Sequence, residues 1–230
     1  FTVEAGRPDS ITREKLEVLR AHGISRISIN PQTMNQKTLD IIGRRHTVEQ
    51  TVDAFHLARE LGFDNINMDL IVGLPGEEYG QVEHTMKAGT ALDPDSITVH
   101  SLAVKRAARL NMFKDQYKEM TFTNNQQIME MTARYAYQAG HSPYYLYRQK
   151  NMAGNFENVG YAKPDSAGIY NILIMEEKQS ILALGAGATS KKVTGELIQR
   201  TENVKDIKNY VERIDEMIER KRLLMETDSQ

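Results

Sequence analysis

Polar side chains that could do chemistry follow short apolar segments of this sequence that have the composition of β-strands. A carboxylate within such a segment is costly to bury unless it is paired or used, and Asp69 occupies this position in residues 66–72. A carboxylate that caps a loop or pairs with an arginine would explain Asp69 equally well. The other polar residues at expected strand ends are Glu4, Asn30, Gln32, His100 and Ser101.

Two glycine-containing segments could bring the backbone close to a ligand. Gly73-Leu74-Pro75-Gly76 permits a tight turn beneath a flat ligand, although many strand-to-helix loops use Gly and Pro in the same way. Residues 185–188 lack the Lys-Ser/Thr of a P-loop and the third glycine of a dinucleotide fingerprint, which excludes both nucleotide motifs. His46 has no second ligand at metal-binding spacing, so the sequence predicts no metal site.

The elements that must position these side chains alternate between strands and helices over the first half of the chain. The sequence predicts strands at residues 2–4, 26–30, 65–72 and 96–100. Helices are expected at 12–22 with Thr12 as N-cap, at 47–62 with a capping box of Thr47 and Gln50, and at 81–92. This alternation indicates an α/β fold with parallel strands, and it fits an open doubly wound sheet and a section of a barrel equally well. In both architectures ligands bind at the carboxyl ends of the strands.

The second half of the chain has a different pattern. The sequence predicts a helix at residues 123–139, a strand at 144–148, an irregular segment at 151–161 and a strand at 181–184. One amphipathic helix is expected to carry Ile207, Val211, Ile214 and Ile218 on its apolar face. A change of organisation near residues 110–122 divides the chain into an α/β portion, residues 1–115, and a smaller C-terminal α+β portion, residues 116–230.

The composition excludes several classes of protein. The 230 residues carry 29 Lys and Arg against 31 Asp and Glu, and this balance argues against a globally basic nucleic-acid-binding protein. No apolar run approaches the roughly 18 residues that span a bilayer and no signal peptide is evident, so we expect a cytoplasmic protein. The absence of cysteine excludes thiolate-ligated iron–sulfur clusters built from these residues. Because the chain opens without Met in a strand-like segment, we expect it to be a piece of something longer.

Several segments together resemble the radical S-adenosylmethionine family of oxygen-independent coproporphyrinogen III oxidases. In the first half these segments are VEAGRPD at residues 3–9, INPQTMN at 29–35, IGRRHT at 42–47 and NINMDLIVGLPGE at 65–77. In the second half YYLYRQKN at residues 144–151, ENVGY at 157–161 and LGAGA at 184–188 are similar to the HemZ-like branch, the coproporphyrinogen dehydrogenases. The order and spacing of these segments over nearly the whole chain carry the resemblance.

The resemblance implies an incomplete TIM-like barrel with S-adenosylmethionine as cofactor. A CxxxCxxC loop holds a [4Fe–4S] cluster in the family, and because this chain has no such loop we expect it to lie N-terminal to residue 1. Glu4 and Asp69 match residues that accept hydrogen bonds from cofactor amine or hydroxyl groups, and Arg44 matches a partner of the cofactor carboxylate. The full set of matched cofactor-binding positions is Glu4, Gln32, Arg44, Asp69, Gly73, Leu74, Pro75, Ala103 and Thr189.

The reaction that the resemblance implies is oxidative decarboxylation of coproporphyrinogen III propionates to vinyls, which forms protoporphyrinogen IX in haem biosynthesis. A radical derived from S-adenosylmethionine, made with a reducing electron donor, would abstract hydrogen from each propionate. Arg148 is expected to bind a substrate carboxylate, with Lys150, Arg106 and Arg109 as further cations, although solvated surface roles are more common for such residues. A sister branch acts as a haem chaperone, so haem binding is the alternative, and this piece alone is expected to be inactive.

Overall fold

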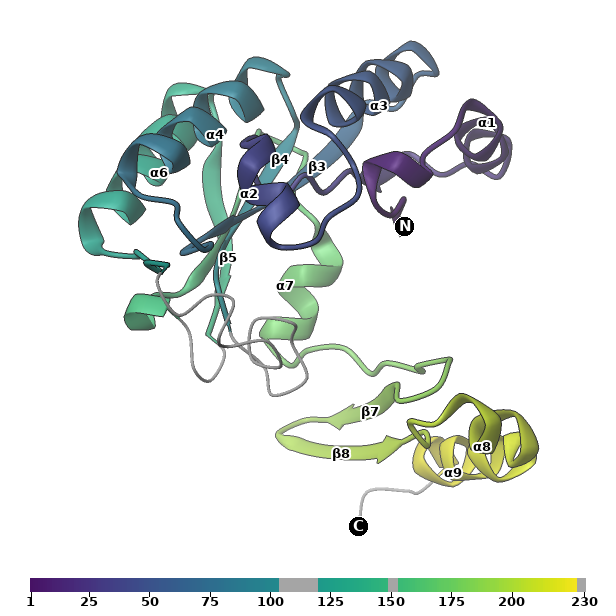
Figure 1. The fold of residues 1–230 in the computed structure, drawn as a ribbon. Coiled ribbons are helices and arrows are strands. Elements are labelled where there is room, and N and C mark those ends of the chain that lie inside the picture. Colours follow the sequence, from purple (N-terminus) through teal and green to yellow (C-terminus); the bar gives the residue numbers. More distant parts are fainter. Residues whose placement is uncertain (104–119, 149–152, 227–230) are drawn as a thin grey trace. The chain divides into compact units, whose positions relative to one another are not determined.

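The computed structural model describes residues 1–103, 120–148 and 153–226, which fold into two compact units (Figure 1). Unit 1 is Phe1–Gly168 and unit 2 is Ile169–Gln230. The boundary that the sequence predicts between residues 115 and 116 lies outside the described residues and stays a prediction.

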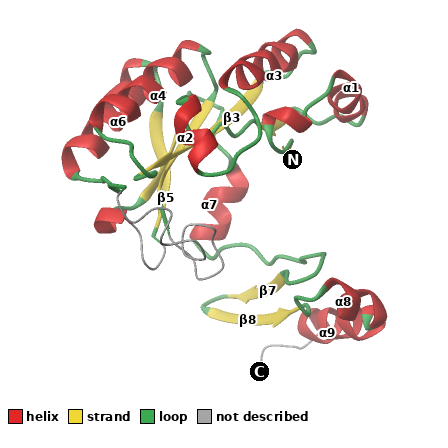
Figure 2. Ribbon diagram, in the orientation of Figure 1, coloured by secondary structure: helices red, strands yellow, loops and turns green. Residues whose placement is uncertain are grey.

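Unit 1 is built on a six-stranded sheet whose first four strands are parallel (Figure 2). The strands are β1 (Thr2–Glu4), β2 (Arg26–Ser28), β3 (Asn65–Val72), β4 (Ser96–Ser101), β5 (Ser142–Tyr147) and β6 (Asn158–Ala162). Their order across the sheet is β1-β2-β3-β4-β6-β5, and β6 runs antiparallel to both of its neighbours. The predicted α/β class with parallel strands is therefore confirmed.

Helices connect the strands of unit 1, and two of them begin at the caps that the sequence predicts. The helices are η1 (Pro8–Ser10), α1 (Arg13–Ala21), α2 (Gln36–Ile41), α3 (Val48–Glu60), α4 (Tyr79–Ala91), α6 (Gln126–Gln138) and η3 (Ala153–Asn155). The Thr12 hydroxyl caps α1, and Thr47 and Gln50 form the reciprocal capping box of α3. Helices α4 and α6 lie side by side over one face of the sheet (Figure 1).

Alternation along the strands gives this sheet one apolar face and one polar face. On β3, Ile66, Met68 and Leu70 are 0%, 0% and 2% exposed and belong to the clusters that pack against the helices. Asn67 and Asp69 alternate with them, so they point to the opposite face. The helices cover the apolar face, and the polar face carries the candidate site.

Unit 2 is built on a two-stranded antiparallel sheet that packs against its last helix. Its elements are α7 (Ile169–Met175), β7 (Thr189–Thr194), β8 (Leu197–Glu202), α8 (Ile207–Glu212) and α9 (Ile214–Glu226). The β7–β8 hairpin has no counterpart in the sequence prediction, because its polar strand residues show no apolar alternation.

Three sequence predictions about local structure are wrong. Residues 158–162 form β6 rather than an irregular segment, because Asn158 and Gly160 are held in the strand by tertiary contacts that override their weak β-propensity. Residues 182–184 form no strand, and Leu184 is 78% exposed. The C-terminal helix breaks at Arg213 into α8 and α9, and the apolar spacing continues across the break, so periodicity did not reveal it.

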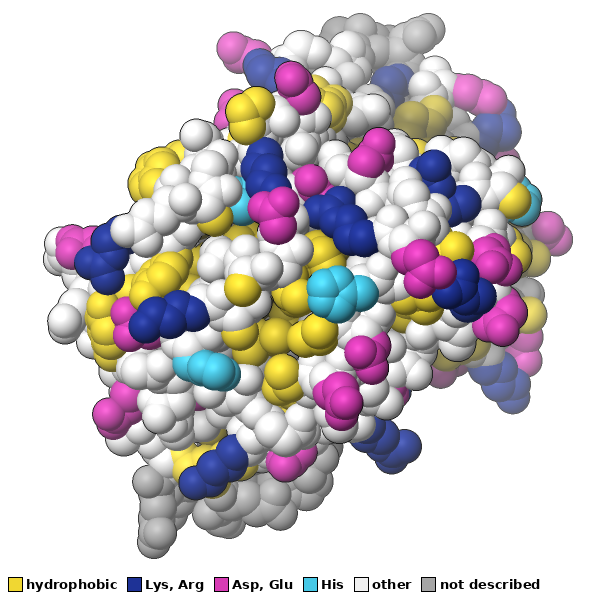
Figure 3. Space-filling view, turned by 90° about the horizontal axis from the view of Figure 1, so that it is seen from above, with side chains coloured by type: hydrophobic (Ala, Val, Ile, Leu, Met, Phe, Trp, Pro, Cys, Tyr) yellow, Lys and Arg dark blue, Asp and Glu magenta, His cyan; other side chains and the backbone are white. Residues whose placement is uncertain are grey.

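Charged side chains of both signs are intermingled on the face of the molecule drawn in Figure 3, where Lys and Arg alternate with Asp and Glu. This distribution agrees with the net charge of -2. Among the described residues, none of the helices is both long enough and apolar enough to cross a bilayer.

Candidate functional site

The side-chain amide of Asn30 links the carboxylate of Glu4 to the backbone of Asp69 at the carboxyl edge of β1–β3. Asn30, which follows β2, donates from Nδ2 to Glu4 Oε2 at 2.9 Å. The Oδ1 atom of Asn30 accepts from the backbone N–H of Asp69 at 3.2 Å. Glu4 and Asp69, which the sequence assigns to one site, are thereby brought together.

The side chain of Asn67 hydrogen-bonds residues of β2, β3 and β4 at this edge. Its Nδ2 donates to Asp69 Oδ1 at 2.8 Å and to Ser28 Oγ at 2.9 Å, and Ser28 Oγ donates to Asn30 Oδ1 at 2.6 Å. The Oδ1 atom of Asn67 accepts from Ser96 Oγ at 3.0 Å. Because these polar groups are paired with one another, the network fixes the carboxylate of Asp69 in one arrangement.

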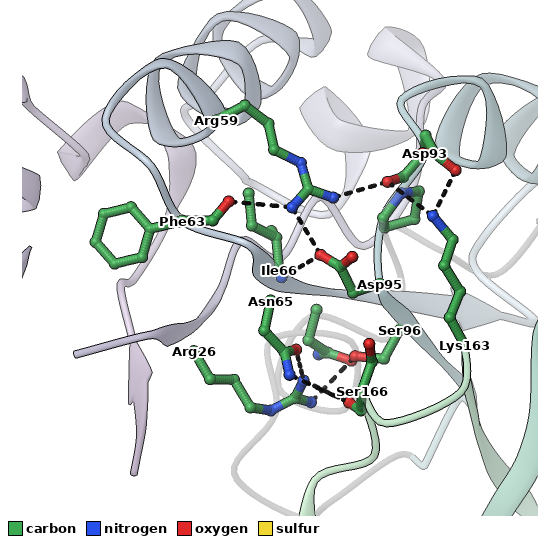
Figure 4. Close-up of polar contacts among 12 residues, drawn as sticks. Arg26, Arg59, Phe63, Asn65, Ile66, Asp93, Asp95, Ser96, Lys163 and Ser166 are labelled. Carbon is green, nitrogen blue, oxygen red and sulfur yellow. Dashed lines mark hydrogen bonds and ion pairs between the residues drawn. The ribbon is translucent and has the colours of Figure 1, made fainter. Parts of the chain in front are cut away.

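Arg26, the first residue of β2, lies at the amino end of the polar face. Its side chain is 7% exposed, points at Asn65 and Ser96, and donates from Nη2 to Ser96 Oγ at 3.1 Å (Figure 4). Its Nη1 also donates to the backbone carbonyl of Ser166 at 3.2 Å. Hydrogen bonds thus run without interruption from Arg26 through Ser96 and Asn67 to the Asp69 carboxylate.

A second cluster ties the amino ends of β3 and β4 together. Arg59 pairs with Asp95 at 2.8 Å, and Asp95 Oδ2 accepts from the Ile66 backbone N–H at 2.7 Å (Figure 4). Lys163 pairs with Asp93 at 2.6 Å. These pairs lie at the end of the strands away from Asp69, so their role is to hold the strands.

The two carboxylates of the edge have pKa values shifted in opposite directions. Glu4 is exposed overall, but partial desolvation of its carboxyl group and the negative charge of Asp69 raise its pKa, against the opposing hydrogen bonds from Asn30 and Ser28. Burial also acts to raise the pKa of Asp69, but His100, Asn67 and Thr98 outweigh it and hold that pKa below its usual value. Asp69 is therefore the more firmly ionised acceptor of the pair.

His100 and two tyrosines of β5 stand beside Asp69. His100 Nε2 lies 3.6 Å from Asp69 Oδ2, and His100 Nδ1 lies 3.0 Å from the Tyr147 hydroxyl. The rings of Tyr145 and Tyr147 are parallel, with centroids 6.1 Å apart, and the Tyr145 ring covers Gly160. Sequence reasoning missed both tyrosines, although aromatic residues two apart on a strand share one face and were a usable signal.

A pocket of about 250 Å³ opens next to this group. It is lined by Gln32, Ile71, His100, Ser101, Leu102, Ala103, Tyr147 and Asn158. Two residues that the sequence assigns to the cofactor, Gln32 and Ala103, therefore line one pocket together with His100, which touches Asp69.

The turns that follow β3 and α2 carry four more of the predicted positions. Gly73 has φ 87°, so the turn after β3 uses the left-handed region, and Leu74 is buried. Pro75 lines a separate pocket beside α2. The backbone N–H of Arg44 donates to the Leu39 carbonyl at 2.9 Å, which closes the turn after α2.

His46, a residue type that can bind metals, is fully buried in the segment that follows the turn after α2. Its Nε2 lies 3.2 Å from the Pro31 carbonyl, and burial lowers its pKa. The buried position of His46 is explained by a structural role, in which a neutral imidazole hydrogen-bonds the Pro31 carbonyl and holds the segment before Gln32. In the described parts of the chain, no three His, Cys, Asp or Glu side chains gather in a way that could hold a metal ion.

For two further predicted positions, the structure shows contacts with residues other than those of this edge. Arg148 follows β5 and forms an exposed ion pair with Glu157. Thr189 is the first residue of β7 in unit 2, and it is exposed. The other cations proposed for the substrate, Arg106, Arg109 and Lys150, lie outside the described residues.

Residues 1–89 match the family model of the Radical SAM superfamily. The chain is also 49% identical over 224 residues to "Oxygen-independent coproporphyrinogen-III oxidase-like protein HemZ" of Bacillus subtilis (strain 168), a match that covers 96% of the chain. Residues 1–89 are therefore a radical SAM domain.

Two further relatives of this radical SAM chain bear on its function. The chain is 40% identical to "Heme chaperone HemW" of Bacillus subtilis (strain 168) over 105 residues, which are 46% of the chain and 27% of that protein. It is 25% identical to "Oxygen-independent coproporphyrinogen III oxidase" of Escherichia coli (strain K12) over 212 residues, which are 91% of the chain and 45% of the relative.

The fold of this radical SAM chain matches a solved structure. Coproporphyrinogen III oxidase (HemN) from Escherichia coli superposes with a TM-score of 0.69 at 23% sequence identity, over 94% of this chain and 48% of the other. The likeness shows that the parallel sheet belongs to the TIM-like radical SAM fold. The chain spans less than half the length of its curated relatives, with 44% of the HemZ protein covered.

Proposed function

We propose that this chain binds S-adenosylmethionine at the carboxyl edge of β1–β4, within a protein that decarboxylates a tetrapyrrole. The observation that carries the proposal is that Asn30 links the Glu4 carboxylate to the backbone of Asp69, and so brings the two acidic residues together beside the pocket of Gln32. The likeness to HemZ over 96% of the chain supports the choice of substrate class.

The polar groups of this edge fit the cofactor. S-adenosylmethionine carries an amine and ribose hydroxyls that donate hydrogen bonds, and Glu4 and Asp69 are acceptors for such groups. It also carries a carboxylate, for which a guanidinium such as that of Arg44 is a bidentate partner. The turn at Gly73 brings backbone close to the edge without a side chain, which suits a flat adenine.

The proposed reaction turns two of the propionate side chains of coproporphyrinogen III into vinyl groups. When bound, S-adenosylmethionine supplies the capacity to remove a hydrogen atom from an unactivated carbon. Each converted propionate would lose a hydrogen atom from its β-carbon to the cofactor, one electron to a one-electron acceptor, and its carboxyl group as carbon dioxide. Its two remaining carbons would then be doubly bonded. The contribution of this chain is to bind both molecules and to exclude water, for which Ile71 and Leu102 line the pocket.

This chain has no cysteine, so none of its residues can ligate a [4Fe–4S] cluster through a thiolate. The cluster that the family uses does not fit the residues present here. The proposed share of this chain is therefore cofactor and substrate positioning.

A haem chaperone is the second candidate function, because the chain is 40% identical to HemW over 105 residues. That likeness covers 46% of the chain, whereas the HemZ likeness covers 96% and includes the strand that carries Tyr145 and Tyr147. The longer match favours the decarboxylase.

An anaerobic assay of the full natural protein tests the proposal. The protein is reconstituted with iron and sulfide and incubated with S-adenosylmethionine, a reductant and coproporphyrinogen III. The proposal predicts 5′-deoxyadenosine together with vinyl products. Formation of 5′-deoxyadenosine without vinyl product would contradict the substrate, and tight haem binding without turnover would favour the chaperone.

A further inference from the structure

His100 contacts a carboxylate with one ring nitrogen and a hydroxyl with the other. Its Nε2 lies 3.6 Å from Asp69 Oδ2, and its Nδ1 lies 3.0 Å from the hydroxyl of Tyr147. In the neutral tautomer with the proton on Nε2, that N–H faces Asp69 Oδ2 and Nδ1 accepts from Tyr147. In the imidazolium form both nitrogens donate, and the tyrosine oxygen accepts, so the arrangement holds in both protonation states.

His100 is the basic side chain that contacts the carboxylate of Asp69. The charged and titratable groups that act on this carboxylate are Glu4 on β1, His100 on β4 and Tyr145 on β5, and Arg26 on β2 acts on Glu4. Of the basic side chains in the described part of the chain, His100 alone comes within 4.0 Å of Asp69. Arg26 donates to Asn65, Ser96 and Ser166, so it acts on Asp69 only through the network.

His100 is itself held from β5. The Tyr147 ring meets the imidazole edge-on, with centroids 6.2 Å apart, and it stacks in parallel with Tyr145. Tyr145 is seated on Gly160, where a Cβ atom would come within 1.9 Å of its ring. A side chain fixed in this way loses little further entropy when a ligand reaches Asp69.

We propose that His100 is a positioning residue, which orients the carboxylate of Asp69 for a hydrogen-bond-donating group of the cofactor and is itself fixed by Tyr147. The inference rests on the proposed function, because it takes the ligand of Asp69 to be S-adenosylmethionine. It adds a residue on β4 and a residue on β5 to a site whose expected ligands lie on the segments around β1–β3 and just after β4.

Two substitutions at residue 100 separate positioning from packing. The amide nitrogen of glutamine reaches about as far as Nε2, so His100→Gln keeps a donor toward Asp69. The amide of asparagine reaches only as far as Nδ1, so His100→Asn keeps the contact with Tyr147 and loses the donor. His84→Gln is the matched control, because His84 is exposed on α4.

The measurement is the Kd of S-adenosylmethionine by anaerobic calorimetry on the full natural protein. His100→Asn should weaken binding about 10-fold, which is the scale of removing a group that orients a ligating residue. His100→Gln should stay within about 3-fold of the wild type, and the His84→Gln control should match it. The affinity of His100→Asn should also fall at a higher pH than that of the wild type as pH is lowered, because Asp69 loses the partner that lowers its pKa.

The outcomes separate the two proposals. Equal affinity of His100→Asn and wild type, or equal losses in the asparagine and glutamine variants, would overturn the role of His100 alone. Absence of binding by the wild type would overturn the proposed function and this inference with it. Should His100→Asn fail to fold, Tyr147→Phe carries the test, with an expected loss of about 3-fold and an unchanged Kd as the contradicting result.

Discussion

The backbone N–H of Gln32 donates to the backbone carbonyl of Asp69 at 3.1 Å, although Gln32 lies beyond the end of β2. The carbonyl of Gln32 accepts in turn from the Ile71 N–H at 2.8 Å. Gln32 is thereby held against β3 with φ 70°, a conformation that side chains other than glycine rarely adopt. The backbone, rather than the side chain, fixes Gln32 at the mouth of the pocket.

Substitution of Gln32 should separate stability from ligand binding. Gln32→Gly removes the cost of the left-handed conformation, so we expect a free energy of unfolding unchanged or higher by up to about 1 kcal/mol. Gln32→Val places a β-branched residue there and should lower it by about 1 kcal/mol or more. Denaturant titration of both variants checks the order, and a glycine variant less stable than the valine variant would contradict it. Both variants should bind S-adenosylmethionine more weakly.

Removal of the Glu4 charge should stabilise the protein and weaken cofactor binding. Partial desolvation and Asp69 raise the pKa of Glu4 above 4.5, so the folded state binds its proton more tightly than the unfolded state does. Ionisation of Glu4 therefore lowers stability as pH rises from 4.5 through the folded pKa, and the loss is complete above it.

Glu4→Gln keeps an oxygen for the Asn30 amide, so at pH 7 it should be more stable by a fraction of a kcal/mol. This difference should vanish below pH 4.5. Urea titrations across this pH range provide the measurement. Glu196→Gln is the control, because Glu196 is exposed in the turn between β7 and β8. A Glu4→Gln variant less stable than wild type at pH 7 would argue against the arrangement of the two carboxylates.

The fit of Tyr145 over Gly160 predicts that no larger residue is accepted at position 160. Gly160→Ala would place a Cβ atom 1.9 Å from Tyr145 Cε1, so the ring must move. We expect a loss of about 1–3 kcal/mol in the free energy of unfolding, as for overpacked cores. Gly80→Ala is the matched control, since its Cβ meets nothing within 4 Å and the change favours helix α4. Thermal unfolding with near-ultraviolet dichroism of the tyrosines compares the two, and similar stability of both variants would contradict the packing.

Arg148 should affect the substrate and leave the cofactor unaffected. Its exposed ion pair with Glu157 contributes little to stability, so the guanidinium can exchange this partner for a propionate. Arg148→Ala should raise the KM for coproporphyrinogen III about 10-fold, the value of one charged hydrogen bond. Glu157→Gln, which leaves Arg148 without competition from that carboxylate, should not raise it. Steady-state assays at saturating S-adenosylmethionine give the answer, and an unchanged KM in Arg148→Ala would remove Arg148 from the site.

Local signals in the sequence were sufficient to predict most of the helices and strands of unit 1. The side chains of Thr12, Thr47 and Gln50 cap the helices that they were expected to cap, and β3 has the predicted bounds of residues 65–72. These elements are specified by short-range hydrogen bonds and by alternation, both of which a single sequence displays. The positions of Glu4 and Asp69 at one edge followed from the parallel order of the strands.

Long-range contacts account for the features that the sequence did not reveal. Strand β6 depends on Asn158, whose side chain accepts from the Ser101 N–H at 2.7 Å, and on Gly160 beneath Tyr145. Neither residue favours a strand by itself. His100 and Asp69 meet because β4 pairs with β3, and paired residues of these two strands lie about 30 positions apart in the sequence. Periodicity within one segment carries no information about such pairs.

A crystal structure of the full natural protein, grown anaerobically with S-adenosylmethionine, shows whether the carboxyl edge of the parallel strands binds this cofactor. We expect density for the cofactor at that edge, with donor groups of the ligand within hydrogen-bond distance of Glu4 and Asp69. We also expect His100 to remain between Asp69 and Tyr147. Cofactor density at another place, or at this edge without contact to either carboxylate, would contradict the proposed binding site.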